Sequence, residues 1–275
     1  PTDPVISVAE AHRFLRQASF GPTPTEVEKV RDIGFEAWID QQLLEPVSLQ
    51  LPYMDDLPEP ENSREGQTNR LDAWFQNVLN GKDQLRQRVA FALSEIIVIS
   101  DQGNLFNFPN GLADYYDKLA INAFANYPDL LKTVTLTPAM GRYLSMLGNQ
   151  KPDKAKNIRP DENYAREVMQ LFSIGLVMLN KDGSVVLDQD NQPIPTYDQA
   201  VIEAFAHVFT GWTFYGSEAF NRPSYIFRAP MVAFQAYHDE GEKRLLNDVI
   251  LPAGQSAEDD LDAALGNITN HANVP

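Results

Sequence analysis

Charged and amide side chains recur at helical spacing in the segment DENYAREVMQLFSIG, residues 161–175. In a helix Asn163 meets Glu167 one turn on, Glu162 meets Arg166 in the same way, and the apolar positions fall on the opposite face. We therefore take Glu167 as a candidate proton acceptor, Arg166 as a candidate anion or oxyanion stabiliser, and Asn163 as a candidate substrate contact. The same face could instead be a buried structural network or a solvated, salt-bridged surface.

His207 is the second candidate for chemistry. It lies on the polar side of a predicted helix with Glu203 one turn earlier, a pairing that can orient an imidazole for acid–base work or hold a metal ion. Trp212 extends the apolar stripe of this helix and is a candidate substrate contact. Two ligands at helical spacing are common by chance, so an exposed pair is the competing interpretation, and no metal site is predicted.

The segment YHDEGEKRLL supplies a third group of candidates. His238 and Asp239 follow a β-like stretch and precede a turn at Gly241, and loops held by a rigid scaffold carry much of protein function. His238 and Asp239 are therefore candidate catalytic residues, and Lys243 is a candidate substrate contact. The alternative is a turn in which Asp239 accepts a hydrogen bond from its own backbone.

Several chemistries lack their residues in this chain. It has no Walker-type phosphate loop, no G-x-G-x-x-G turn, no G-x-S-x-G elbow and no H-E-x-x-H pair. Asp188, Asp190 and Gln192 alternate oxygen donors as a calcium loop does, but the glycine and closing glutamate of such a loop are missing and Pro193 intervenes. Nucleotide and serine-hydrolase mechanisms are therefore disfavoured, and the residues leave the cofactor unknown.

The charge balance disfavours polyanionic partners. Thirty-eight acidic and 22 basic residues give a net charge of −16, which opposes binding to nucleic acid. One loop is locally basic and contains Lys151, Lys154, Lys156 and Arg159. It is either a solvated loop or an anion-docking loop. The absence of cysteine excludes disulfides and thiolate chemistry, and no apolar run is long enough to predict a membrane span.

The elements that must position these side chains are mostly helices. A capping box at Ser7 and a Thr23-Pro24 start open two helices, and a third covers residues 35–44. Further helices are predicted at 70–80, 84–99, 112–127, 138–147, 161–179 and 197–210, with a last one after Ser256.

The segments between these helices are irregular or β-like. Residues 45–68 form a surface excursion rich in proline and acid, and residues 181–197 form a β-hairpin insert. We expect a mainly α fold over 1–275, as one multi-helix domain with a small β-hairpin and short β pieces in its second half.

Five segments together carry a family resemblance across nearly the whole chain: AHRFLRQASFGPTPTEVEKVRDIGFEAWIDQQL, TPAMGRYLSMLGN, DENYAREVMQLFSIGL, PIPTYDQAVIEAFAHVFTGW and HDEGEKRLL. With them the chain resembles the bacterial family catalogued as domain of unknown function 1800, whose biochemistry is unassigned. Gln17 stands where the family commonly has Arg, and Ala272 stands where it usually has Pro.

The resemblance implies a helical, exported protein at the cell surface, in the periplasm or outside the cell, with a secreted sulfatase-like protein as a possible partner. It also implies that the chain is truncated at Pro275, because members normally continue further. The start PTDPVISVAE would suit a product from which a signal peptide has been removed.

The sequence supports two classes of function. The first is a hydrolytic or other acid–base enzyme, with its site between the helix 161–179, the helix 197–210 and the loop 238–243. In that site His207 or His238 is the second proton carrier. The second is a non-catalytic extracellular scaffold or binding module, in which the same residues form a structural polar network.

Overall fold

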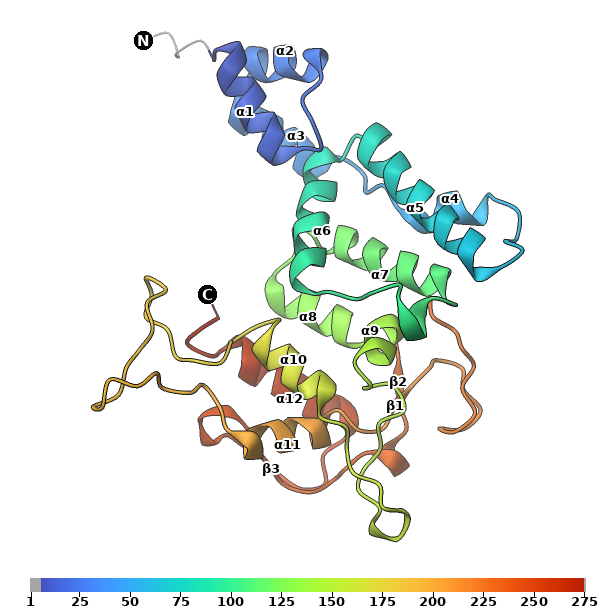
Figure 1. Ribbon diagram of the computed structural model, residues 1–275, viewed down its shortest axis with the longest axis vertical. Coiled ribbons are helices and arrows are strands. Elements are labelled where there is room, and N and C mark those ends of the chain that lie inside the picture. Colours follow the sequence, from blue (N-terminus) through green and yellow to red (C-terminus); the bar gives the residue numbers. More distant parts are fainter. Residues whose placement is uncertain (1–5, 275) are drawn as a thin grey trace. The chain divides into compact units, whose positions relative to one another are not determined.

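The computed structural model describes residues 6–274 and shows the predicted mainly α fold (Figure 1). Within that range there are twelve α-helices and two small antiparallel sheets. The described residues divide into two compact units, 6–101 with 106–126, and 102–105 with 127–274. Close packing within a unit does not test whether it folds alone, so the single domain stays a prediction. The expectations about the first five residues and about the end at Pro275 lie outside the described residues.

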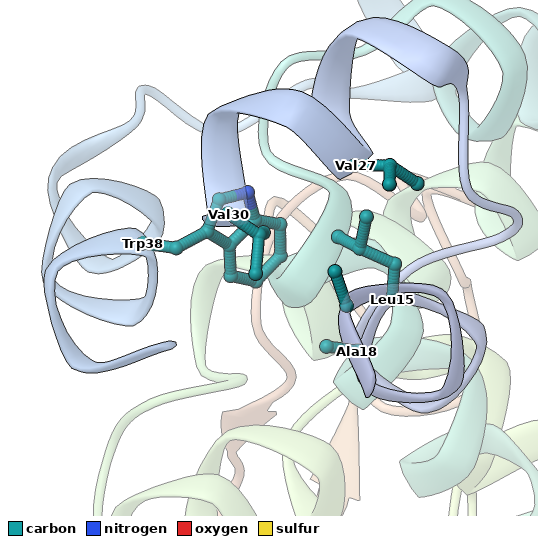
Figure 2. Packing of buried hydrophobic residues seen from close by; sticks show 6 residues of the cluster. Leu15, Ala18, Val27, Val30 and Trp38 are labelled. Atoms are coloured by element: carbon teal, nitrogen blue, oxygen red, sulfur yellow. The ribbon is translucent and has the colours of Figure 1, made fainter. Parts of the chain in front are cut away.

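The first unit contains seven helices: α1 (Val8–Ala18), α2 (Pro24–Ile33), α3 (Phe35–Leu44), α4 (Gln50–Asp55), α5 (Ser63–Asn80), α6 (Gln84–Ile96) and α7 (Pro109–Ile121). Leu15 of α1 packs with Val27 and Val30 of α2 and with Trp38 of α3, and all four side chains are buried (Figure 2). This cluster joins the first three helices into one layer.

The starts of the first two helices agree with the sequence prediction. Ser7 and Glu10 form the capping box, with Ser7 Oγ accepting from the Glu10 amide at 3.2 Å and Glu10 Oε2 accepting from the Ser7 amide at 2.9 Å. Thr23 caps α2 and Pro24 occupies its first turn. These caps are local, since each donor and acceptor lie three residues apart.

The segment 45–68, predicted as a surface excursion, is partly helical. It contains α4 and the start of α5. The carboxylate of Asp117, on α7, accepts the amide N–H of Gln50 at 2.7 Å and that of Leu51 at 3.0 Å. This cap satisfies free amides at the start of α4 from a residue more than sixty positions away, so no local pattern could reveal it.

The second unit holds the candidate residues. Its helices are α8 (Tyr127–Thr135), α9 (Pro138–Tyr143), α10 (Asn163–Gln170), α11 (Gln199–Val208) and α12 (Ala257–Thr269). Its sheets pair β1 (Trp212–Thr213) with β2 (Val232–Ala233), and β3 (Lys243–Arg244) with β4 (Ile250–Leu251). Helix α11 packs against α10, α12 and β3 (Figure 1).

Most of the predicted helices from residue 70 onward differ from the observed bounds by several residues, and α8 was not predicted; two of these differences bear on the candidate site. Helix α10 ends at Gln170, well before residue 179, because the chain turns: the amide of Gly175, at φ 72°, donates to the Met169 carbonyl. The N-cap of α11 is Asp198, whose Oδ1 accepts the Val201 amide at 3.0 Å. Thr196, two residues before this cap, donates its hydroxyl to the Gly175 carbonyl at 2.5 Å.

The predicted hairpin at 181–197 is present as irregular antiparallel pairing. Val186 donates to the Met178 carbonyl at 2.8 Å, and Ile194 donates to the Val186 carbonyl at 3.1 Å. The segment before the hairpin therefore joins it as a third extended piece. Among residues 6–274 no helix is long and apolar enough to cross a bilayer.

Candidate functional site

The polar face of α10 makes an exposed network with the start of α11. Arg166 Nη2 lies 3.0 Å from Glu162 Oε2, and Gln199 Nε2 donates to the same oxygen at 2.9 Å. The Arg166 side chain is 41% exposed, so this ion pair adds little stability. Its effect is positional, since it fixes the Glu162 carboxylate between the two helices.

Glu167 and Asn163 lie elsewhere on the same helix. Glu167 is half-buried, and its Oε2 is buried without a hydrogen-bond partner in the described structure. It lies near Tyr197, whose pKa is raised first by burial; Arg166 opposes that rise and Glu167 adds to it. Asn163 is exposed, and its backbone amide donates to Asp161 Oδ1 at 2.9 Å.

His207 and Asp239 form a close pair. His207 Nδ1 lies 2.5 Å from Asp239 Oδ2, with the His207 side chain 33% exposed and the Asp239 side chain 18% exposed. The hydrogen bond with His207, assisted by the Gly241 amide, lowers the pKa of Asp239 to about 2 against the opposing effect of burial. Asp239 is therefore ionised at neutral pH and accepts the Nδ1 proton of His207, which leaves Nε2 as the ring nitrogen that can exchange a proton with another group.

Backbone contacts hold Asp239 in place. Its amide donates to Thr210 Oγ1 at 2.9 Å, and the Gly241 amide donates to Asp239 Oδ1 at 2.7 Å. The turn predicted as the alternative to a catalytic Asp239 is therefore present, together with the His207 contact. The same carboxylate closes the turn with one oxygen and orients His207 with the other.

His238, next to Asp239 in the chain, belongs to a different and fully buried network. His238 Nε2 lies 3.0 Å from Asp260 Oδ2 on α12, and its Nδ1 lies 3.0 Å from the Thr210 carbonyl. Lys243 Nζ lies 2.7 Å from the same Asp260 oxygen. It also donates to the carbonyls of Asp239 at 2.5 Å and Gly241 at 2.8 Å, which uses all its donors.

Two hollows meet at His207. One, of about 310 Å³, is lined by residues that include Glu203, Ala204, His207 and Glu242, and we call it the Glu242 hollow. The other, of about 210 Å³, is lined by Pro152, Arg159, Pro160, Glu162, Glu203, Ala206 and His207, and we call it the Arg159 hollow.

The two hollows lie on opposite flanks of one ridge. Glu203 and His207 are four residues apart on α11 and border both hollows, whereas Ala206 borders only the Arg159 hollow and Ala204 only the Glu242 hollow. Side chains at this spacing stack into a ridge along a helix. A bound molecule on either side would therefore contact the imidazole.

The structure brings some of the predicted residues together and separates others. His207 and Lys243 line the Glu242 hollow, and Asp239 contacts His207. The remaining candidates line neither hollow: Asn163, Arg166, Glu167, Trp212 and His238. Trp212 is 3% exposed in β1, with a buried Nε1 that has no hydrogen-bond partner in the described part of the chain.

Sequence reasoning missed Asp260, which joins His238 to Lys243. It lies in the first turn of α12, where acidic residues are ordinary because they offset the helix dipole, so its position gave no distinct signal. No group of three His, Cys, Asp or Glu side chains within 6–274 is arranged to hold a metal ion.

These features define a mainly helical protein with a partly exposed His–Asp pair between two hollows. A family model described as "Protein of unknown function (DUF1800)" matches residues 13–275, and the chain belongs to that family. Neither the comparison with curated proteins nor the comparison with solved structures gave a match.

Proposed function

We propose that this protein is an acid–base enzyme, of hydrolytic type, in which His207 transfers the proton and Asp239 positions it. The supporting observation is the 2.5 Å contact between His207 Nδ1 and an Asp239 carboxylate whose pKa is lowered to about 2. Such a carboxylate holds one ring tautomer and stabilises the imidazolium that forms when Nε2 accepts a proton from water or a substrate hydroxyl.

The choice of His207 over the other candidates follows from access. His207 borders both hollows, whereas the His238 side chain is 0% exposed and both of its ring nitrogens are within hydrogen-bonding distance of protein atoms. Glu167 is half-buried and borders neither hollow. A group that exchanges protons with a substrate must be within hydrogen-bond reach of it, so His207 is the proton carrier.

The test is turnover of a panel of chromogenic esters, glycosides, phosphate esters and sulfate esters by wild type and variants. We expect His207→Gln to lower kcat by about 10²–10⁴-fold on whichever class is turned over. Asp239→Asn lowers kcat by a comparable factor with little change in KM, since Asp239 does not touch substrate. His12→Gln, an exposed histidine of the first unit, is the matched control and keeps full activity.

The same substrate panel also separates the enzyme from the non-catalytic class of function. Full activity in His207→Gln overturns the assignment of the proton carrier. No turnover of any substrate class favours the second candidate, a non-catalytic scaffold or binding module. The observation behind that candidate is the His238–Asp260–Lys243 network, which is buried and paired through Asp260 Oδ2, although Asp260 Oδ1 has no partner in the described structure.

Export, and interaction with a secreted sulfatase-like protein, are proposed on family membership. Fractionation of bacteria that express the full-length gene should place the protein outside the cytoplasm. Affinity capture from the same extracellular fraction, with the sulfatase-like protein supplied purified, tests the partner. Recovery only in the cytoplasm, or no retention of the purified partner, contradicts these two proposals.

A further inference from the structure

The basic loop at 151–159 is closed and held in place, which fixes the position of Arg159. The backbones of Asp153 and Ile158 pair in both directions at 3.1 and 2.9 Å, and Asp153 Oδ1 accepts two amides inside the loop. Beyond it, the side chain of Asn149 accepts the Asp161 amide at 2.9 Å and donates to the Asp161 carbonyl at 3.2 Å. Arg159 therefore lies between two segments whose backbones are held by hydrogen bonds.

Arg159 differs from the other basic residues of this loop. Lys156 is paired with Asp153 at 2.9 Å, and Lys151 and Lys154 are exposed and border neither hollow. Among the four, Arg159 is the one that lines either of these two hollows, and it shares its hollow with His207. No carboxylate in residues 6–274 lies within ion-pairing distance of its guanidinium, although the chain carries 38 acidic residues.

Two carboxylates border the Arg159 hollow, and neither forms an ion pair with Arg159. Glu162 Oε2 is held by Arg166 at 3.0 Å and by Gln199 at 2.9 Å, and Glu203 Oε1 accepts a hydrogen bond from Gln199 at 3.4 Å. The Arg159 guanidinium therefore keeps its donors free. A planar guanidinium with free donors binds carboxylate, sulfate and phosphate groups through paired hydrogen bonds.

The other flank of the Glu203–His207 ridge has the opposite character. In the Glu242 hollow, Lys243 forms an ion pair with Asp260 and donates to two carbonyls, and Arg244 is paired with Asp248. Glu242 forms no ion pair with the described residues. Glu203 borders both hollows, so the flanks differ in their other unpaired charge: a carboxylate, Glu242, which repels anions on this flank, and a guanidinium, Arg159, which attracts them on the other.

We propose that the Arg159 hollow binds an anionic group of the substrate, a carboxylate, sulfate or phosphate, and thereby places the adjacent bond beside His207 Nε2. This inference rests on the proposed function for the reaction at His207, but anion binding itself does not depend on it. Arg159 is then the residue that selects acidic substrates.

Anion binding is tested without turnover, through the imidazole resonances of protein labelled at histidine. Acetate, sulfate and methyl phosphate are titrated separately at constant ionic strength, and the three arms distinguish the carboxylate, sulfate and phosphate readings of the site. We expect the His207 resonance to shift saturably with at least one anion. Arg159→Gln weakens that binding by about ten- to a hundredfold, the value of a charge-assisted hydrogen-bond pair.

Lys154→Gln is the matched control, since it removes the same charge from the same loop at a residue that borders neither hollow. We expect it to change the affinity by less than about twofold, the scale of screened surface charge. The proposal is overturned if no anion shifts His207, if Arg159→Gln binds as wild type does, or if Lys154→Gln weakens binding equally.

The two proposals fail separately. Loss of turnover in His207→Gln with no anion binding retains the acid–base site and removes the Arg159 subsite. Anion binding that depends on Arg159, together with full turnover in His207→Gln, retains the subsite and removes the proton carrier. With an active acidic substrate, Arg159→Gln raises KM more than it lowers kcat, and a neutral analogue shows no such rise.

Discussion

Replacing Lys243 with methionine should destabilise the second unit strongly. Lys243 is 3% exposed, and its ammonium lies 2.7 Å from Asp260 Oδ2 in a site where the Asp260 carboxylate is fully buried. Methionine keeps most of the length of the side chain but removes the charge and three donors. Asp260 is left with His238, at 3.0 Å, as its only partner in the described structure.

The magnitude follows from the burial of Asp260. Breaking a buried ion pair from one side costs about 3–5 kcal/mol, because the remaining charge stays desolvated. His238 can partly offset this, so we expect about 3 kcal/mol, a large fraction of a typical folding free energy of about 5–15 kcal/mol. The double variant Lys243→Met with Asp260→Asn removes the orphaned charge and should recover at least about 1 kcal/mol of the loss.

The assay is urea unfolding followed by ¹⁹F NMR of protein labelled with 5-fluorotryptophan. Trp212 reports on the second unit, and Trp38 and Trp74 report on the first. With an m-value of about 1.5–2 kcal/mol/M, the Trp212 midpoint should fall by about 1.5–2 M. Lys181→Met, at an exposed position in the hairpin turn, is the control and leaves the midpoint nearly unchanged.

Two results would refute this reasoning. A loss below about 1 kcal/mol would mean that Lys243 behaves as an exposed lysine does. Failure of the double variant to recover stability would mean that the loss came from packing and not from the uncompensated Asp260 charge.

Three further predictions concern other positions. Burial raises the pKa of Asp117 to about 6, so the stability gained from its protonation is fully present below about pH 4 and is lost as the pH rises through 6. The melting temperature of wild type relative to Asp117→Asn should therefore rise on acidification across that window. A difference that stays constant with pH rules this out. The pKa of Asp239 is lowered to about 2, so the ionised carboxylate adds about 1 kcal/mol of stability after solvent screening, present above about pH 4 and lost as the pH falls through 2. Thermal melts of wild type and Asp239→Asn should therefore differ at pH 7 and converge near pH 2. Gly211 has φ 89°, and an added Cβ would lie 3.0 Å from His238 Cβ, so Gly211→Ala should lower the unfolding free energy by about 1–3 kcal/mol in urea melts. Gly183 has φ 81°, but no atom lies within 4 Å of a Cβ added there, so an equal effect of Gly183→Ala would show that backbone strain alone is responsible.

Features set within one or two helical turns were predictable. The Ser7–Glu10 box and the Thr23 cap need only residues three apart, and the helical period alone predicts α11 and its polar residues Glu203 and His207. Prediction failed where a distant contact intervened. The amides at the start of α4 are capped by Asp117, a contact that stabilises a helix in a segment whose composition favours a loop.

The candidate site shows the same division. His207 and Asp239 were each singled out as candidates, but their pairing across 32 positions was not predicted. His238 and Asp239 are neighbours in sequence, yet one is buried against Asp260 and the other reaches the partly exposed His207. In an extended chain, successive side chains point to opposite sides, so the fold on each side decides their environments.

The amino-acid sequence by itself determined the family, the mainly α class, the absence of thiol chemistry and the set of polar residues that could act. Only the tertiary structure decided which of them share a site. It enclosed His238 and Lys243 with Asp260, and it left His207 between two hollows with Arg159 on one flank. The physical reason is that helical periodicity and capping depend on neighbours a few residues away, whereas burial, pKa and pairing depend on segments brought together by packing.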